Sequence, residues 1–208
     1  MDRVIGSVDA RLRAAATMSS DPVADSERPG VDAPEQVHSR EQRRHVAGLM
    51  RVNHAGEVAA QALYEGHALL ARTSEQRAQM GQAAEEERRH LEWCHARLKE
   101  LGAGPSKLDP VWFGGALLAG MAAAAAGDKW SLGFVAETER QVVEHLQGHL
   151  SRLPADDHRT RAILEQMISD EARHGRDAVD AGGQDLPAPV RALMRMTAKV
   201  MTRSAYWV

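Results

Sequence analysis

Cysteine, aromatic residues and long hydrophobic runs are all scarce in this chain of 208 residues. The single cysteine, Cys94, excludes an internal disulfide framework and a cysteine-rich zinc or iron–sulfur site, and it favours a reducing compartment. Aromatic residues make up only 4% of the chain while alanine is abundant, which favours helices over β-sheet. The net charge of -3 argues against a dedicated nucleic-acid-binding protein. We therefore expect an all-α fold.

The N-terminal 38 residues differ from the rest in composition. Residues 1–17 have the spacing of a short amphipathic helix, and they lack the apolar segment of a secretory signal. Asp2 and Asp9 in the same stretch argue against a mitochondrial transit peptide. Residues 18–38 contain three prolines among acids and serines, which predicts a flexible linker. We expect one helical domain at 39–208, preceded by this short helix and linker at 1–38.

Apolar residues recur with helical spacing through the expected domain. They predict helices from Ser39 to about Arg72, from about Thr73 to Leu101, from Trp130 to Leu153, and from the Pro154–Asp157 break to about Ala181. Ser39 is the expected N-cap of the first helix. A last helix is expected after Pro187 and Pro189.

Residues 111–127 form an uncharged stretch of 17 residues that contains seven alanines and four glycines. This length is near the lower limit for crossing a bilayer, and Trp112, Phe113 and Trp130 at its ends suit a membrane interface. A buried helix of a soluble bundle explains the same composition equally well. The last expected helix carries a basic stripe that is either a solvated face or a contact with anionic lipid: Arg191, Arg195, Lys199 and Arg203.

Two motifs place a glutamate three residues before a histidine: Glu87 with His90, and Glu171 with His174. On a helix, positions i and i+3 share a face, so both side chains of a pair can reach one metal ion. A carboxylate-bridged two-metal site in a helix bundle needs two such pairs and one lone glutamate from each of two further helices. The motifs therefore predict a metal centre if the chain supplies these two glutamates.

Glu57 and Glu139 lie at the required heights. In an antiparallel helix pair, residues at equal distance from the turn lie at the same level. Glu57 and Glu87 are equidistant from the expected turn at position 72, and Glu139 and Glu171 from position 155. The predicted metal ligands are Glu57, Glu87, His90, Glu139, Glu171 and His174. Four carboxylates and two imidazoles suit iron or manganese, and two divalent ions would leave the site near neutral.

Each assignment has an alternative. Glu85 and Glu86 adjoin Glu87 but lack its spacing to His90, and Glu137 competes with Glu139. Tyr64 and His145 are candidates for contact with the ligands rather than for metal binding, and His149 follows His145 by one turn. Cys94 is most simply a small core residue. We expect Glu100 and Glu165 to be solvated.

The heptapeptide Arg51–Glu57 (RVNHAGE), taken with the two Glu-x-x-His motifs and Glu139, resembles the demethoxyubiquinone hydroxylases of ubiquinone biosynthesis. The resemblance runs from about Arg40 to the C-terminus. It implies a ferritin-like four-helix bundle with additional membrane-interacting helices and two iron ions per chain. The implied reaction is hydroxylation by O2 of a demethoxyubiquinol-type ring, a 2-polyprenyl-3-methyl-6-methoxy-1,4-benzoquinol. The implied location of this bacterial-type member is the cytoplasmic face of the inner membrane, with peripheral attachment.

One difference from this family concerns His145. Animal members place a tyrosine directly after the corresponding histidine, whereas Leu146 stands here, which argues against a tyrosine-assisted electron path. The first rival hypothesis is a ferritin- or rubrerythrin-like iron-handling protein, although rubrerythrin's Cys-x-x-Cys pairs are absent. The second is a non-enzymatic helical scaffold. A homo-oligomer and a complex with other enzymes of ubiquinone biosynthesis both stay open.

Overall fold

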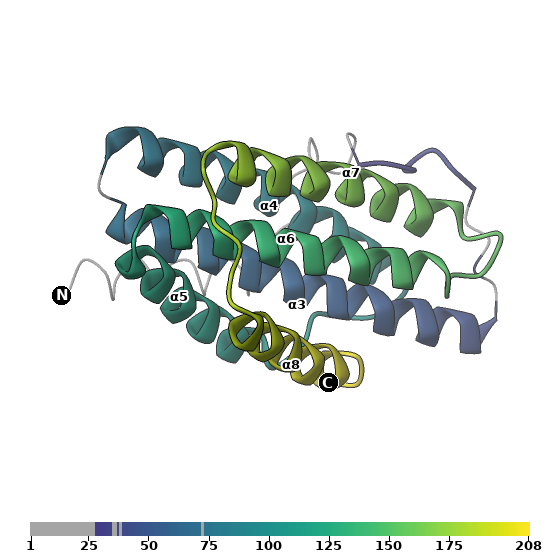
Figure 1. Cartoon of the computed structure of the whole chain (residues 1–208). Coiled ribbons are helices and arrows are strands. Elements are labelled where there is room, and N and C mark those ends of the chain that lie inside the picture. The colour runs from purple at the N-terminus through teal and green to yellow at the C-terminus, as the bar shows by residue number, and fades with distance from the viewer. Residues whose placement is uncertain (1–27, 35–36, 38, 72) are drawn as a thin grey trace, which may run out of the picture.

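Four long helices lie side by side as two antiparallel hairpins in the computed structural model, which describes residues 28–34, 37, 39–71 and 73–208 (Figure 1). The predicted helix at 1–17 lies outside these residues. The described part holds six helices and no strand, which confirms the all-α prediction: α3 (Arg40–Leu70), α4 (Ser74–Glu100), α5 (Asp109–Ala126), α6 (Asp128–Leu150), α7 (His158–Asp180) and α8 (Ala188–Ala205). Helices α3 and α4 form the first hairpin, and α6 and α7 the second.

Side-chain caps set where three of the long helices begin. The Ser39 hydroxyl accepts a hydrogen bond from the backbone N–H of Gln42 at 3.0 Å, as expected of an N-cap. Thr73 caps α4 in the same way through the N–H of Gln76 at 3.1 Å. Asp157 caps α7, with its Oδ1 3.0 Å from the N–H of Thr160. Both hairpin turns therefore lie where the spacing of the motifs requires them.

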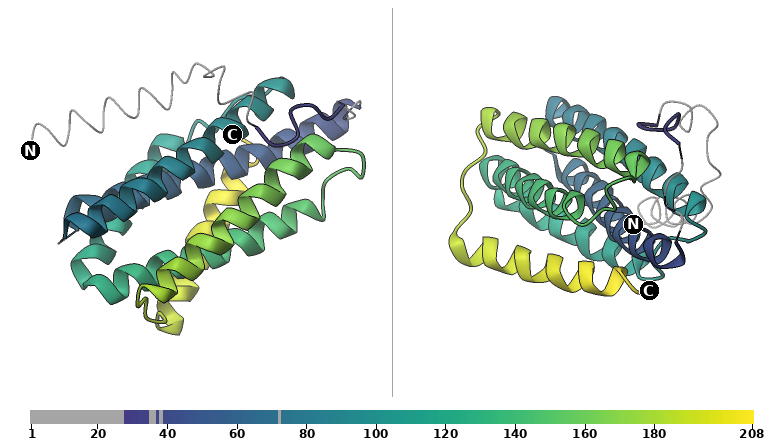
Figure 2. Two further views of the ribbon diagram at one scale, coloured as in Figure 1. Left: turned by 90° about the horizontal axis from the view of Figure 1, so that it is seen from above. Right: turned by 90° about the vertical axis from the view of Figure 1, so that its right-hand side faces the viewer.

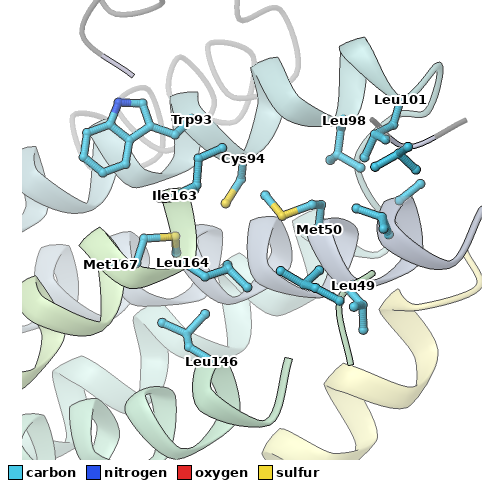
Figure 3. Close-up of a cluster of buried hydrophobic side chains, with 14 residues drawn as sticks. Leu49, Met50, Trp93, Cys94, Leu98, Leu101, Leu146, Ile163, Leu164 and Met167 are labelled. Carbon is cyan, nitrogen blue, oxygen red and sulfur yellow. The ribbon is translucent and has the colours of Figure 1, made fainter. Parts of the chain in front are cut away.

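The main hydrophobic core fills one end of the bundle between the two hairpins (Figure 3). Its central side chains come from all four long helices: Leu49, Met50, Trp93, Cys94, Leu98, Leu146, Ile163, Leu164 and Met167. Cys94 is fully buried among them, as expected of a small core residue. This apolar end holds the four helices together without any contribution from the polar residues farther along them.

Helix α5 packs closely against α3 through two glycines. A Cβ on Gly120 would lie 2.2 Å from the carbonyl oxygen of Leu63, and one on Gly66 would lie 2.3 Å from that of Leu117. Only Phe113, Gly120 and Ala124 of α5 are buried, so it is a surface helix rather than the buried helix of a soluble bundle. By length and composition alone, α5 is the one described helix that could cross a membrane. Helices α5 and α8 lie on the side of the bundle away from α4 and α7 (Figures 1 and 2).

A cluster of charged residues, here called the Arg97 cluster, joins α4 to the start of α7. The Arg97 guanidinium is completely buried and donates to Glu100 at 2.7 Å, to Asp157 at 3.1 Å and to Thr160 at 2.9 Å. Arg28, at the described end of the predicted linker, also pairs with Glu100. Of the described residues between 28 and 38, Arg28 and Val37 are both buried against the bundle.

Candidate metal centre

The six predicted ligand residues are all buried in the middle of the bundle. One comes from α3, two from α4, one from α6 and two from α7: Glu57; Glu87 and His90; Glu139; Glu171 and His174. Each hairpin thus brings a lone glutamate level with a Glu-x-x-His pair, as the antiparallel geometry predicts.

The ligand atoms form two groups that share two glutamates. Within each group, one oxygen or nitrogen from every residue lies within 4.8 Å of the others. The first group is Glu57, Glu87, His90 and Glu171, and the second is Glu87, Glu139, Glu171 and His174. Because Glu87 and Glu171 belong to both groups, the arrangement can hold two cations joined by two carboxylates.

Both histidines turn their Nδ1 atoms toward the carboxylates. The Nδ1 atom of His90 lies 3.1 Å from Glu171 Oε1 and 3.4 Å from Glu87 Oε2. The Nδ1 atom of His174 lies 3.2 Å from Glu171 Oε2 and 3.3 Å from Glu87 Oε1. The two nitrogens that face the centre are therefore the ones available to bind a metal.

The charges at the centre are only partly balanced by the protein. Among the described residues, both oxygens of Glu87, Glu57 Oε2, Glu171 Oε1 and His90 Nδ1 lack a hydrogen bond of good geometry, although they are buried. Burial raises the pKa of Glu57 and of Glu139 well above the usual carboxyl value, and the neighbouring carboxylates Glu87 and Glu171 add to the effect. Buried oxygens without hydrogen bonds are unfavourable unless a cation binds them, so this donor set fits two divalent ions.

The metal-free centre would hold protons instead of metal. Burial alone would lower the pKa of His174, but its contacts with the carboxylates of Glu171, Glu87 and Glu86 outweigh burial and raise the pKa to about 11. The pKa of His90 is also raised, because its contacts with Asp170, Glu171, Glu57 and Glu87 outweigh the effect of burial. Metal binding must therefore release protons from these histidines.

Two further carboxylates bind the outward-facing Nε2 atoms of the histidines. Asp170 Oδ2 lies 3.2 Å from His90 Nε2, and Glu86 Oε2 lies 2.6 Å from His174 Nε2. Neither acid was singled out from the sequence in this role. The signal was nonetheless present, because an acidic residue directly precedes the shared glutamate in both motifs.

Tyr64 touches the centre, as predicted for a residue in contact with the ligands. Its hydroxyl donates a hydrogen bond to Glu139 Oε1 at 2.5 Å. It also lines a cavity of about 200 Å³ between α4, α6 and α7, whose other walls include Met80, Val135, Arg173 and His174. The cavity therefore reaches the side chain of one histidine of the centre.

The comparisons with known proteins agree with this geometry. Residues 44–205 match the family model described as "Ubiquinone biosynthesis protein COQ7". The chain is 58% identical to "3-demethoxyubiquinol 3-hydroxylase" of Cupriavidus taiwanensis, covering 99% of both chains. It is 53% identical to the protein of the same name from Nitrosococcus oceani, covering 100% of this chain and 96% of that one. The chain belongs to the COQ7 family. The family predicted from the heptapeptide and the two motifs is thereby confirmed.

Within this COQ7-family fold, the remaining candidate residues lie outside the centre. Glu85 is exposed and pairs with Arg88, and Glu137 binds Arg140 and Gln141 instead of facing the other carboxylates. In the part of the chain that the structure describes, no hydrogen bond or ion pair joins His145 to the six residues. Its ring instead packs 4.0 Å from that of His149, whose Nδ1 lies 2.8 Å from Asn53 Oδ1.

Proposed function

We propose that this chain is a monooxygenase that uses O2 to hydroxylate the ring of a 2-polyprenyl-3-methyl-6-methoxy-1,4-benzoquinol, with two iron ions held by the six buried residues. The observation that carries the proposal is the pair of four-residue groups that share Glu87 and Glu171. The names of the relatives supply the reaction, since they are called 3-demethoxyubiquinol 3-hydroxylases. Their names point away from an iron-storage protein and from a non-enzymatic scaffold.

The six residues have distinct roles in this proposal. Glu57 and His90 would hold one ion, Glu139 and His174 would hold the other, and Glu87 and Glu171 would contribute to both. When bound, the iron pair supplies the activation of O2. Tyr64 holds the carboxylate of Glu139 in place through its hydrogen bond. The apolar residues Leu63, Val135 and Ala178 pack around Tyr64.

The cavity beside His174 is the proposed place for the quinol ring. Its volume of about 200 Å³ is below the roughly 300–1,000 Å³ of pockets for drug-sized ligands. It can therefore take a ring but not a polyprenyl chain, which must extend along the surface of the protein, because no residue of α5 or α8 lines the cavity. Gln79, Gln82 and Arg173 give the cavity polar groups that can bind the oxygens of the ring.

The proposed reaction is tested by the quinones of a strain in which Glu171→Ala replaces this chain. Because Glu171 belongs to both ligand groups, its loss affects both proposed ions. We expect the demethoxy intermediate to accumulate and ubiquinone to fall to the level of the deletion strain, as measured by mass spectrometry. Glu165→Ala, an exposed residue of α7, is the matched control and should leave ubiquinone unchanged. Normal ubiquinone in the Glu171→Ala strain contradicts the proposal.

We propose in addition that α5 and α8 attach the protein peripherally to the cytoplasmic face of the inner membrane. Large apolar side chains are exposed on both helices and at the C-terminus: Val111, Leu118, Leu193, Met196, Val200 and Trp207. The basic residues of α8 suit anionic lipid head groups, except that Arg195 also lies 3.7 Å from Glu137 of α6. A lipid surface is the favoured occupant because the substrate's polyprenyl chain is itself a membrane component.

Flotation with vesicles that contain anionic lipid tests this attachment. Leu193→Asp and Met196→Asp together should move the full-length protein from the vesicle fraction to the soluble fraction. Val179→Asp removes an apolar side chain of similar exposure from α7 and should have no effect. Equal flotation of all variants contradicts the proposal. A native protein that forms a dimer in solution and does not float with the vesicles contradicts it as well.

A further inference from the structure

We propose that Arg173 is a positioning residue that orients both histidines of the metal centre by holding Glu86 and Asp170. The inference rests on the proposed function only in that His90 and His174 bind metal. It concerns a side chain that lies outside the two ligand groups. It arises from the way the two outer carboxylates are connected.

Each of the two outer carboxylates, Glu86 and Asp170, binds a histidine of the opposite helix. Glu86 of α4 binds His174 of α7, and Asp170 of α7 binds His90 of α4. Each acid directly precedes a glutamate shared by both ligand groups, so the two halves of the arrangement are related by approximate two-fold symmetry. Each histidine is thus held by the helix opposite its own.

A single guanidinium connects the two halves. Arg173 Nη2 donates to Glu86 Oε2 at 3.0 Å and to Asp170 Oδ1 at 3.2 Å. Hydrogen bonds between two charged groups are stronger than neutral ones, and a planar guanidinium can serve both carboxylates at once. Glu86 and Asp170 are themselves partly exposed, with 15% and 19% of their side chains accessible, so water competes for their oxygens. Gln166 Nε2 also donates to Asp170 Oδ2, at 3.1 Å. Arg173 therefore adds to the restraint on Asp170 and connects that carboxylate to Glu86.

The orientation of the carboxylates decides which imidazole nitrogen is available to metal. A carboxylate that accepts a hydrogen bond from Nε2–H keeps the proton on that nitrogen and leaves the Nδ1 lone pair for the ion. Both Nδ1 atoms face the shared glutamates here, so both histidines need the same tautomer. By holding Glu86 and Asp170, Arg173 therefore favours the same tautomer in both histidines.

Arg89 provides a matched comparison within the chain. It directly precedes His90, just as Arg173 directly precedes His174. Arg89 is nevertheless exposed, and in the described part of the chain its side chain makes no hydrogen bond or ion pair with Glu86 or Asp170. The two carboxylates are therefore placed symmetrically but the two arginines are not. Of this pair of arginines, Arg173 alone contacts the carboxylates.

The test is calorimetric titration of the metal-free full-length chain with Co²⁺, with the visible absorption of bound Co²⁺ as a second readout. Wild type should bind two ions. Arg173→Ala should weaken both sites by up to about 10-fold, the lower end of the 10–100-fold cost of losing the direct partner of a metal ligand, because Arg173 acts through Glu86 and Asp170. It should also change the absorption of both ions. Arg89→Ala should match wild type in affinity and in absorption.

Three further variants separate a local effect from loss of the fold. Glu86→Gln should weaken only the site that contains His174, and Asp170→Asn only the site that contains His90. Arg173→Lys should give an intermediate affinity, because an ammonium carries the charge but not the planar geometry. Wild-type affinity in Arg173→Ala at both sites, or weakening of one site alone, overturns the inference. A wild-type chain that binds fewer than two ions contradicts the proposed function itself, and the inference with it.

Discussion

Two groups of charged side chains are buried in this bundle, and they differ in where their positive charge comes from. In the Arg97 cluster, a buried guanidinium lies among Glu100, Asp157 and Thr160 and donates to all three. At the candidate metal centre, four carboxylates converge with two histidines, and several of their oxygens have no hydrogen bond of good geometry from the described residues. The first group takes its positive charge from Arg97, although Asp157 Oδ2 is buried without a hydrogen bond from any described residue, whereas the second needs protons or metal ions.

The difference separates a structural role from a functional one. Buried charges are tolerated when hydrogen-bonded partners surround them, and Arg97 meets that condition at the junction of α4 and α7. The carboxylates of the centre lie on four well-packed helices that hold them together despite their repulsion. The stability of the rest of the bundle must offset this repulsion, which is common at sites that bind a ligand. Removing one residue from each group should therefore change stability in opposite directions.

The largest expected effect is the loss of stability in Arg97→Met. The substitution leaves Asp157 buried without its guanidinium, and breaking a buried ion pair from one side costs about 3–5 kcal/mol. Urea unfolding of the metal-free chain should show this loss. Lys99→Met changes an exposed cation two residues away on the same helix and should change the unfolding free energy by less than about 0.5 kcal/mol. If the two variants lose the same unfolding free energy, the Arg97 cluster does not have the structural role described here.

Glu57→Gln should have the opposite effect on the metal-free chain. The pKa of Glu57 is raised by burial, so its ionised form destabilises the folded state at neutral pH, and a neutral amide of similar shape removes that penalty. We expect about 1–2 kcal/mol of added stability by urea unfolding, with weaker Co²⁺ binding in the same preparation. Glu165→Gln on the surface of α7 should change neither quantity. If Glu57→Gln is less stable than the wild-type chain, the metal-free protein already stabilises the Glu57 carboxylate through its own contacts.

The convergence of the six predicted residues was largely predictable from the sequence because its geometry is local. Spacing of three residues on a helix fixes Glu87 beside His90, and the distance to a hairpin turn fixes Glu57 at the same level. When two hairpins whose ligand residues lie at matching levels pack together, those residues meet at one place in the bundle. The same reasoning separates Glu139 from Glu137, since only Glu139 lies on the inner face that also carries Leu146.

The partners of buried charges were not predictable in the same way. Glu100 was expected to be solvated, yet it contacts Arg97 of its own helix and Arg28, which precedes α3 in the chain. The contact of Arg173 with Glu86 likewise joins residues 87 positions apart. Such pairs depend on the rotation of each helix about its axis and on the packing between helices, which a sequence pattern does not fix closely enough to pair individual side chains. Arg89 and Arg173 look equivalent in the sequence and differ only after packing.

His67 offers a third case, a buried histidine without a carboxylate. It is 1% exposed on α3 and packs edge-on against Phe134, with ring centroids 6.3 Å apart. Burial lowers its pKa to about 4, whereas the carboxylates around His174 raise the pKa of that histidine to about 11. The two histidines should therefore respond to acid in opposite ways.

The effect of His67 should appear between pH 6.5 and pH 4. In this window the unfolded chain binds a proton at position 67 and the folded chain does not, so stability falls as the pH falls, by about 1.4 kcal/mol per pH unit. His67→Leu should reduce the slope of unfolding free energy against pH by this amount in metal-free protein. His158→Leu, at the exposed start of α7, should leave the slope unchanged. If both variants keep the wild-type slope, His67 is protonated in the folded chain, and burial without a carboxylate does not keep a histidine neutral in this bundle.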